Sequence, residues 1–126
     1  MRPRTALAGV ALLLTATLAA CSGASAGQPS ADPSAADVQV SASDMAFDQA
    51  VVTAPAGEAF TIGFTNNDAM PHNLVIYTDS SKATRLFEGA VTEKGTVVYE
   101  VPALDAGTYF FECSLHPGMR GSLVVE

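Results

Sequence analysis

Between residues 37 and 126 of this 126-residue chain, apolar side chains recur at every second position. Phe60, Ile62 and Phe64 alternate with small or polar residues. This is the pattern of a half-buried β-strand, because successive side chains of a strand point to opposite faces. Further strands are expected at residues 38–40, 74–77, 96–101, 108–113 and 122–126. Residues 81–89 fit a turn of helix or an irregular loop as well as a strand, and no stretch offers a long helical face.

Clusters of turn-forming residues at 56–57, 66–68, 79–81 and 105–107 separate the expected strands. Short strands at this spacing predict an all-β, antiparallel sandwich. The ninety residues 37–126 are enough for one small hydrophobic core and leave no room for a second domain. We therefore expect one folded domain, 37–126.

The N-terminal segment is typical of export. Arg2 and Arg4 precede residues 6–20, an apolar run without charge that is short for a membrane span and suits a signal peptide. The sequence Leu18-Ala19-Ala20-Cys21 resembles the lipobox of bacterial lipoproteins, in which the cysteine is acylated and begins the mature chain. We expect residues 1–20 to be a lipoprotein signal peptide and Cys21 to anchor the protein outside the cytoplasm, on the bacterial cell membrane. Two alternatives are cleavage near Ala20 with an ordinary thiol at Cys21, and an uncleaved anchor helix.

Residues 21–36 are predicted to be the lipidated cysteine and a flexible tether, because Ser, Ala, Gly, Pro, Gln and Asp cannot bury enough apolar area to fold. The formal charge is −7 for the whole chain. Removal of Arg2 and Arg4 leaves four basic residues against thirteen acidic ones, or −9. Nucleic acid is therefore not an expected partner. The acidic surface favours basic redox partners, or is simply a solvated surface.

Cys113 is the only cysteine between residues 37 and 126, so the domain has no disulfide. An exposed lone thiol outside the cytoplasm would be open to oxidation, and metal ligation would protect it. The alternative is a buried, inert cysteine that packs as a small hydrophobe.

Four residues carry metal-binding chemistry. Cys113, His116 and Met119 have the spacing C-x2-H-x2-M, and His72 lies in the triplet Pro-His-Asn about forty residues earlier. One thiolate, two imidazoles and one thioether are the ligands of a mononuclear blue-copper electron-transfer site, with methionine as the weak axial ligand. Each residue alone suits a turn, a surface position or a core. Together they include both histidines of the chain. Zinc also suits thiolate and imidazole, but the thioether favours a single copper ion.

The expected strands explain how these ligands could meet. Tyr109, Phe111 and Cys113 alternate, so they should share the face that points into the core. Pro117 and Gly118 permit a tight turn that returns the two later ligands to the thiolate. The other histidine would arrive from the start of a separate strand. Packing of the sandwich would then limit ligand movement when the metal changes oxidation state.

Two segments resemble the cupredoxins, with amicyanin as the closest likeness. They are Ala69-Met70-Pro71-His72-Asn73 and the ending from 107 to 126, which contains Cys113-Ser114-Leu115-His116-Pro117-Gly118-Met119. The resemblance implies a Greek-key β-sandwich with copper near one end. It makes His72, Cys113 and His116 the equatorial ligands and Met119 the axial one. Leu115 stands where a proline is usual in amicyanin, Gly118 replaces a bulky aromatic residue, and the lipoprotein signal is a third difference.

The resemblance also implies supporting residues around the ligands. Asn73 would brace the ligand loop by hydrogen bonding near Ser114, which orients ligands and tunes the potential. An apolar docking patch would surround the exposed edge of His116, and it comprises Met70, Pro71, Pro117 and Gly118. Backbone shape explains Pro117 and Gly118 equally well.

The expected function is one-electron transfer by a Cu(II)/Cu(I) site on a membrane-tethered monomer, between a redox-protein donor and an acceptor that the sequence does not identify. Four protein ligands leave no open position for a substrate, so an enzyme is not expected. One alternative is a copper chaperone or store that uses the same ligands. Another is a domain that acts through protein contacts, with the metal incidental.

Overall fold

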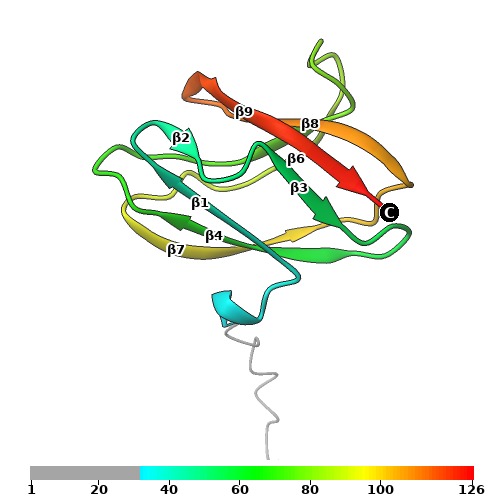
Figure 1. Ribbon diagram of the computed structural model, residues 1–126, viewed down its shortest axis with the longest axis horizontal. Coiled ribbons are helices and arrows are strands. Elements are labelled where there is room, and N and C mark those ends of the chain that lie inside the picture. The colour runs from blue at the N-terminus through cyan, green and yellow to red at the C-terminus, as the bar shows by residue number, and fades with distance from the viewer. Residues whose placement is uncertain (1–31) are drawn as a thin grey trace, which may run out of the picture.

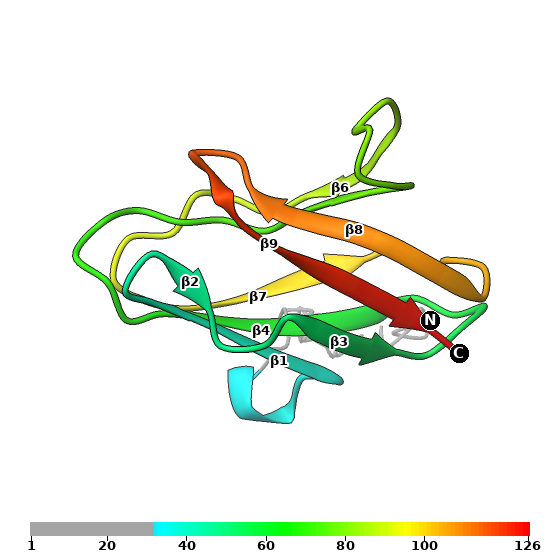
Figure 2. The same cartoon turned by 45° about the horizontal axis from the view of Figure 1, so that its top comes forward.

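The computed structural model describes residues 32–126, and the predicted signal peptide, Cys21 and most of the predicted tether lie outside this range. Two β-sheets pack face to face (Figures 1 and 2). The first has the order β2 (Ala46–Phe47), β1 (Val38–Ser43), β4 (Phe60–Asn66), β7 (Gly95–Val101). The second has the order β3 (Val51–Ala54), β9 (His116–Val125), β8 (Gly107–Cys113), β5 (Val75–Tyr77), β6 (Arg85–Glu88). The prediction of an all-β sandwich is confirmed.

Both sheets are mixed, so the expectation of purely antiparallel pairing was wrong. Strand β1 pairs with β4 in parallel, with Val38 opposite Ile62, and β3 pairs with β9 in parallel, with Val52 opposite Leu123. The alternating pattern reports only which face of a strand is buried. That face is the same in parallel and antiparallel pairs, so the pattern does not fix strand direction.

Three strands were not expected as such, and the last strand begins earlier than expected. Strands β2 and β3 are two and four residues long, and β6 lies within residues 81–89, where the sequence left a strand and a loop open. The last strand begins at His116 rather than at residue 122. Short strands at sheet edges take their conformation from a neighbouring strand, and their own sequence carries a weak signal.

Aromatic rings and aliphatic side chains from both sheets form the core. Phe60, Ile62 and Phe64 of β4 are at most 2% exposed, as the alternating pattern predicted. The Phe64 and Tyr99 rings stack with centroids 5.6 Å apart, and Phe47 contacts Phe111 edge to face at 5.2 Å. Each such side chain contributes about 1.5–3 kcal/mol by leaving water. The sandwich is therefore held by contacts between its two sheets.

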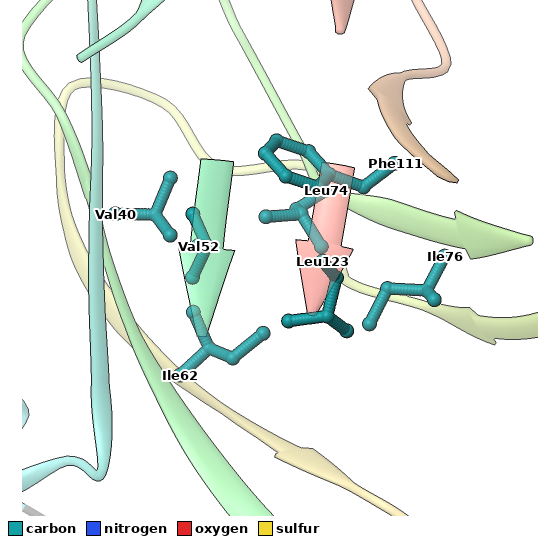
Figure 3. A pocket seen from close by; sticks show the side chains of 7 residues that line it. All are labelled: Val40, Val52, Ile62, Leu74, Ile76, Phe111 and Leu123. Atoms are coloured by element: carbon teal, nitrogen blue, oxygen red, sulfur yellow. The ribbon is translucent and has the colours of Figure 1, made fainter. Parts of the chain in front are cut away.

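A small cavity of about 10 Å³ remains between the sheets (Figure 3). Seven apolar side chains line it: Val40, Val52, Ile62, Leu74, Ile76, Phe111 and Leu123. A space of this size holds at most one water molecule, and a water needs two or more polar partners, which these side chains do not offer. The cavity is an imperfection of core packing and offers no ligand site.

The described chain begins with η1 (Pro33–Ala35), a 3-10 turn on the outer face of the four-stranded sheet (Figure 1). Gln39 Nε2 donates to the Pro33 carbonyl at 2.6 Å. A Cβ atom at Gly63 would lie only 2.4 Å from that carbonyl oxygen, so this close approach requires glycine. The final residues of the predicted tether thus form a turn against β4. Among residues 32–126, no helix is long and apolar enough to cross a membrane.

Candidate metal centre

His72 lies in the crossover between the two sheets, after β4 and before β5. Its backbone N–H donates to the Thr92 carbonyl at 3.1 Å, and the Thr92 N–H donates back to the His72 carbonyl at 2.8 Å. Asn66 Nδ2 donates to the carbonyls of Met70 and Thr92 at 2.8 and 2.9 Å. These bonds fix the backbone of the crossover and hold the imidazole in the interior, where His72 is fully buried.

Cys113 ends β8, and His116 begins β9 after a turn at Ser114 and Leu115. The predicted turn at Pro117 and Gly118 was wrong, because both residues lie within β9. The two strands pair as a hairpin in which Cys113 lies opposite His116, with a bulge between Glu112 and Cys113. The bulge interrupts the alternation of faces, so Glu112 is buried beside the cysteine. Its carboxylate pairs there with Lys82 Nζ at 3.0 Å. Phe111 and Cys113 point into the core as expected, whereas Tyr109 is half-buried at the edge of the core.

The donor atoms of three residues converge. Cys113 Sγ lies 3.7 Å from His72 Nδ1 and 3.6 Å from His116 Nδ1, and the two Nδ1 atoms are 3.0 Å apart. Cys113 and His72 are fully buried, while His116 is half-buried. Met119, the fourth predicted ligand, is buried in β9 three residues after His116. One hairpin and one crossover therefore bring His72, Cys113 and His116 together, and Met119 lies in the same hairpin.

This geometry fits a bound metal ion. An ion about 2.0–2.3 Å from nitrogen and sulfur donors would lie between the three atoms. Metal binding requires unprotonated Nδ1 atoms and a thiolate, and in this arrangement their lone pairs would meet at one point that a cation stabilises. Two imidazoles, a thiolate and a buried thioether match the preferences of copper, and the absence of carboxylates from this set disfavours calcium and magnesium.

The sequence matches the family described as "Cupredoxin-like domain" over residues 9–125. The chain belongs to the cupredoxins. Amicyanin-alpha of Methylorubrum extorquens is 32% identical over 121 residues, which cover 96% of this chain and 98% of that protein. Amicyanin of Paracoccus denitrificans is 36% identical over 66 residues, covering 52% of this chain. The chain spans only about half of the length of the two Paracoccus amicyanins, 49% and 54%.

A solved structure agrees with this assignment. Auracyanin A, a "blue" copper protein from Chloroflexus aurantiacus, superimposes with a TM-score of 0.62 at 25% identity. The match covers 70% of this cupredoxin and 96% of auracyanin A. The similarity thus extends over almost the whole of that copper protein.

Asn73 joins the two segments that carry the ligands. Its Oδ1 accepts the backbone N–H of Ser114 at 2.9 Å and the Ser114 hydroxyl at 3.0 Å. Its Nδ2 donates to the Gly89 carbonyl at 3.1 Å. The contact that the resemblance implied between Asn73 and Ser114 is present in this cupredoxin. It holds the turn between Cys113 and His116 against the start of β5.

Asp68 also contacts a predicted ligand, a contact that the sequence pattern does not predict. Asp68 Oδ2 lies 2.8 Å from His72 Nε2, the ring nitrogen that faces away from the site. The backbone N–H of Met45, the contact with His72 and the N–H of Asp44 hold the pKa of Asp68 below its usual value, against the opposing effect of burial. The sequence of residues 66–68 predicts only a turn. Nothing local in the sequence distinguishes an aspartate that caps a turn from one that also reaches a ligand.

Several apolar side chains near the ligands are exposed. Met70 and Leu115 are 52% and 47% exposed, Pro117 and Gly118 are exposed, and Pro71 is half-buried. Met45, whose backbone binds Asp68, is 46% exposed. The four residues of the predicted docking patch therefore reach the surface to differing degrees. Leu115 and Met45 are further exposed apolar residues beside the ligand segments.

Proposed function

We propose that this cupredoxin is a one-electron carrier that holds a single copper ion through His72, Cys113, His116 and Met119. The observation that carries the proposal is the convergence of the two Nδ1 atoms and the Cys113 sulfur within 3.7 Å of one another. Bound copper would supply a one-electron Cu(II)/Cu(I) couple. Similarity to the amicyanins and to the copper protein auracyanin A supports the same function.

The protein contributes burial and rigidity to such a site. Cys113, His72 and Met119 are at most 2% exposed, so their side chains exclude water from the interior side of the centre. The Asn73 bonds and the bridge between His72 and Thr92 hold the ligand segments in one arrangement. Fixed ligands need little rearrangement when an electron arrives or leaves. All four donors come from the protein, which leaves no position for a substrate and favours a carrier over an enzyme.

Partner docking is proposed at the half-buried edge of His116. Of the four ligands, His116 has the greatest exposure, and the exposed residues Met70, Pro117 and Gly118 belong to the proposed docking patch. An apolar patch of this kind lets a partner approach a ligand without desolvating charges. The formal charge of −7 favours redox partners with basic surfaces.

Membrane tethering through a lipid on Cys21 is part of the proposal, as is a monomeric carrier outside the cytoplasm. The described chain starts at η1, on the outer face of the four-stranded sheet and away from the β8–β9 hairpin (Figures 1 and 2). A tether at that face would leave the edge of His116 accessible to a redox partner. Wild-type protein in the detergent phase of a Triton X-114 partition, and Cys21→Ser in the aqueous phase, would support the anchor. Equal partition of the two would refute it.

Voltammetry on copper-loaded protein tests the carrier function. We expect one copper per chain and a reversible one-electron wave, with fast exchange because the ligands move little. Sluggish exchange, together with rapid loss of Cu(I) to a chelator, would favour the copper chaperone or store instead. Absence of copper binding would refute both functions.

A further inference from the structure

The carboxylate of Asp68 bonds to three groups. Oδ1 accepts the N–H of Asp44 at 2.7 Å, Oδ2 accepts the N–H of Met45 at 3.0 Å, and Oδ2 also lies 2.8 Å from His72 Nε2. Asp44 and Met45 have left-handed backbone angles, with φ of 52° and 62°, and form the turn between β1 and β2. Asp68 thus connects a strained surface turn to a fully buried imidazole.

Asp68 is itself fixed on the side away from this turn. Its own N–H donates to Asn66 Oδ1 at 2.9 Å, and Asn66 Nδ2 binds the carbonyls of Met70 and Thr92. Every buried side-chain nitrogen and oxygen among the described residues has a hydrogen-bond partner, so this network is complete. The carboxylate is therefore held by contacts that do not involve His72.

The chemistry of the two groups fixes the direction of their hydrogen bond. An ionised carboxylate has no proton to give, so His72 Nε2 must carry the hydrogen. A neutral imidazole with hydrogen on Nε2 has its lone pair on Nδ1, the atom that faces Cys113 and His116. Partners of this kind set the tautomer and ring orientation of metal-binding histidines and make them more basic.

We propose that Asp68 is a positioning residue of the metal centre, which holds His72 as the Nε2–H tautomer and lowers the reduction potential through its negative charge. The lowering of the potential rests on the proposed copper function. A negative charge one imidazole away from the ion stabilises Cu(II) more than Cu(I). The tautomer is a property of the protein alone.

The first experiment uses the copper-free protein. Long-range ¹H–¹⁵N NMR at neutral to mildly alkaline pH distinguishes the two tautomers of neutral His72. We expect hydrogen on Nε2 in the wild type and a loss of this preference in Asp68→Ala. Hydrogen on Nδ1 in the wild type would overturn the proposal, whether or not any variant folds. This readout does not depend on copper, so it stands even if the proposed function fails.

The second experiment measures the reduction potential of the copper-loaded protein. Asp68→Asn can keep an amide oxygen toward His72 and Met45, giving up the bond from Asp44, so it removes the charge and retains the acceptor. We expect its potential to rise above that of the wild type while the Nε2–H tautomer persists. A matched control is Asp48→Asn, because Asp48 accepts the N–H of Ser41 at 2.8 Å and bonds to no ligand.

The outcomes separate the two proposals. A blue wild type in which Asp68→Asn and Asp48→Asn have the same potential overturns the role of the Asp68 charge and leaves the carrier function intact. A wild type that binds no copper overturns the carrier function, and the tautomer measurement then decides the positioning role alone. Equal rises in both variants would indicate a general effect of surface charge and would also overturn the role.

Discussion

At the scale of single residues, the buried carboxamide of Asn73 connects three segments of the chain by hydrogen bonds. It accepts two hydrogen bonds from Ser114, next to Cys113, and donates one to Gly89, the residue after β6. Asn73 and Gly89 are buried, so bulk water cannot replace the bond between them. The arrangement of the ligand turn therefore depends on this side chain.

We expect Asn73→Ala to destabilise the copper-free protein by about 1–3 kcal/mol, because it leaves the Gly89 carbonyl and the Ser114 N–H without their partner. Copper should also dissociate faster from the loaded protein. Urea unfolding and transfer of copper to a chelator measure the two effects. Ser114→Ala is the control, since it loses only the hydroxyl bond and should cost less. Equal stability of the two variants would contradict this role of Asn73.

At the scale of elements, the residue that follows β6 lies close to β7. A Cβ atom at Gly89 would lie 2.6 Å from the ring of Tyr99 in β7. The Tyr99 hydroxyl donates to the Ala90 carbonyl at 2.7 Å, just before the segment that pairs with His72. Packing of β6 against β7 thus helps to position the crossover that carries a ligand.

Gly89→Ala should cost about 1–3 kcal/mol of unfolding free energy, because the added methyl group must displace the Tyr99 ring or the backbone. Gly107→Ala is a matched control. Its Cβ would meet Tyr109 at an ordinary 3.8 Å, so stability should stay the same or rise slightly. Urea titrations of the copper-free proteins give both values. An unchanged unfolding free energy in Gly89→Ala would contradict this prediction and show that the Tyr99 ring moves aside freely.

The hydrogen bonds between Asp37, just before β1, and Thr61 of β4 should make the unfolding free energy depend on pH. Asp37 Oδ2 accepts the N–H and the hydroxyl of Thr61, both at 2.8 Å, and these bonds lower the pKa of Asp37. A carboxyl group with a lower pKa in the folded state contributes stability above its unfolded pKa of about 3.9, and loses it as pH falls through the folded value. Asp37→Asn should therefore be less stable than wild type at pH 7, and the difference should shrink below about pH 4. Unfolding titrations across this range test it, and a difference independent of pH would contradict it.

At the scale of the whole molecule, sequence and structure agree best where residue chemistry carries the signal. Three of the four predicted ligands, His72, Cys113 and His116, converge in the structure. They could be predicted because thiolate and imidazole are specific metal donors. Strand β4 could be predicted because its apolar residues alternate, and Phe60, Ile62 and Phe64 are indeed all buried. The role of Asp68 could not be predicted, because its contact with His72 depends on how the turn at Asp44 and Met45 folds over the crossover.

The alternating sequence pattern could not predict strand direction or the short edge strands, because both depend on the three-dimensional path of the chain. Parallel pairing of β1 with β4 and of β3 with β9 follows from the path of the chain between the sheets. Val51 is 58% exposed and Val52 is 4% exposed, so β3 does alternate. Four residues are nevertheless too few for the pattern to stand out. The domain boundaries at 20, 36 and 37 and the lipid on Cys21 remain predictions.

The acidic charge of the molecule predicts how electron exchange responds to salt. With a formal charge of −7, the protein should react faster with a cationic inorganic oxidant than with an anionic one of similar driving force. Added salt should slow the first reaction and speed the second, because it screens both interactions. Stopped-flow kinetics on the reduced copper protein measure the rates. Rates independent of ionic strength for both oxidants would contradict electrostatic steering.

The visible absorption spectrum after addition of Cu(II) tests the central claim most directly, because an intense band arises only if the Cys113 thiolate bonds to the ion. Wild-type protein should turn blue with one equivalent of copper, and Cys113→Ser should stay colourless. Retained folding of the variant, checked by circular dichroism, makes the comparison fair. A wild-type protein that binds Cu(II) without colour would contradict the assignment of this site.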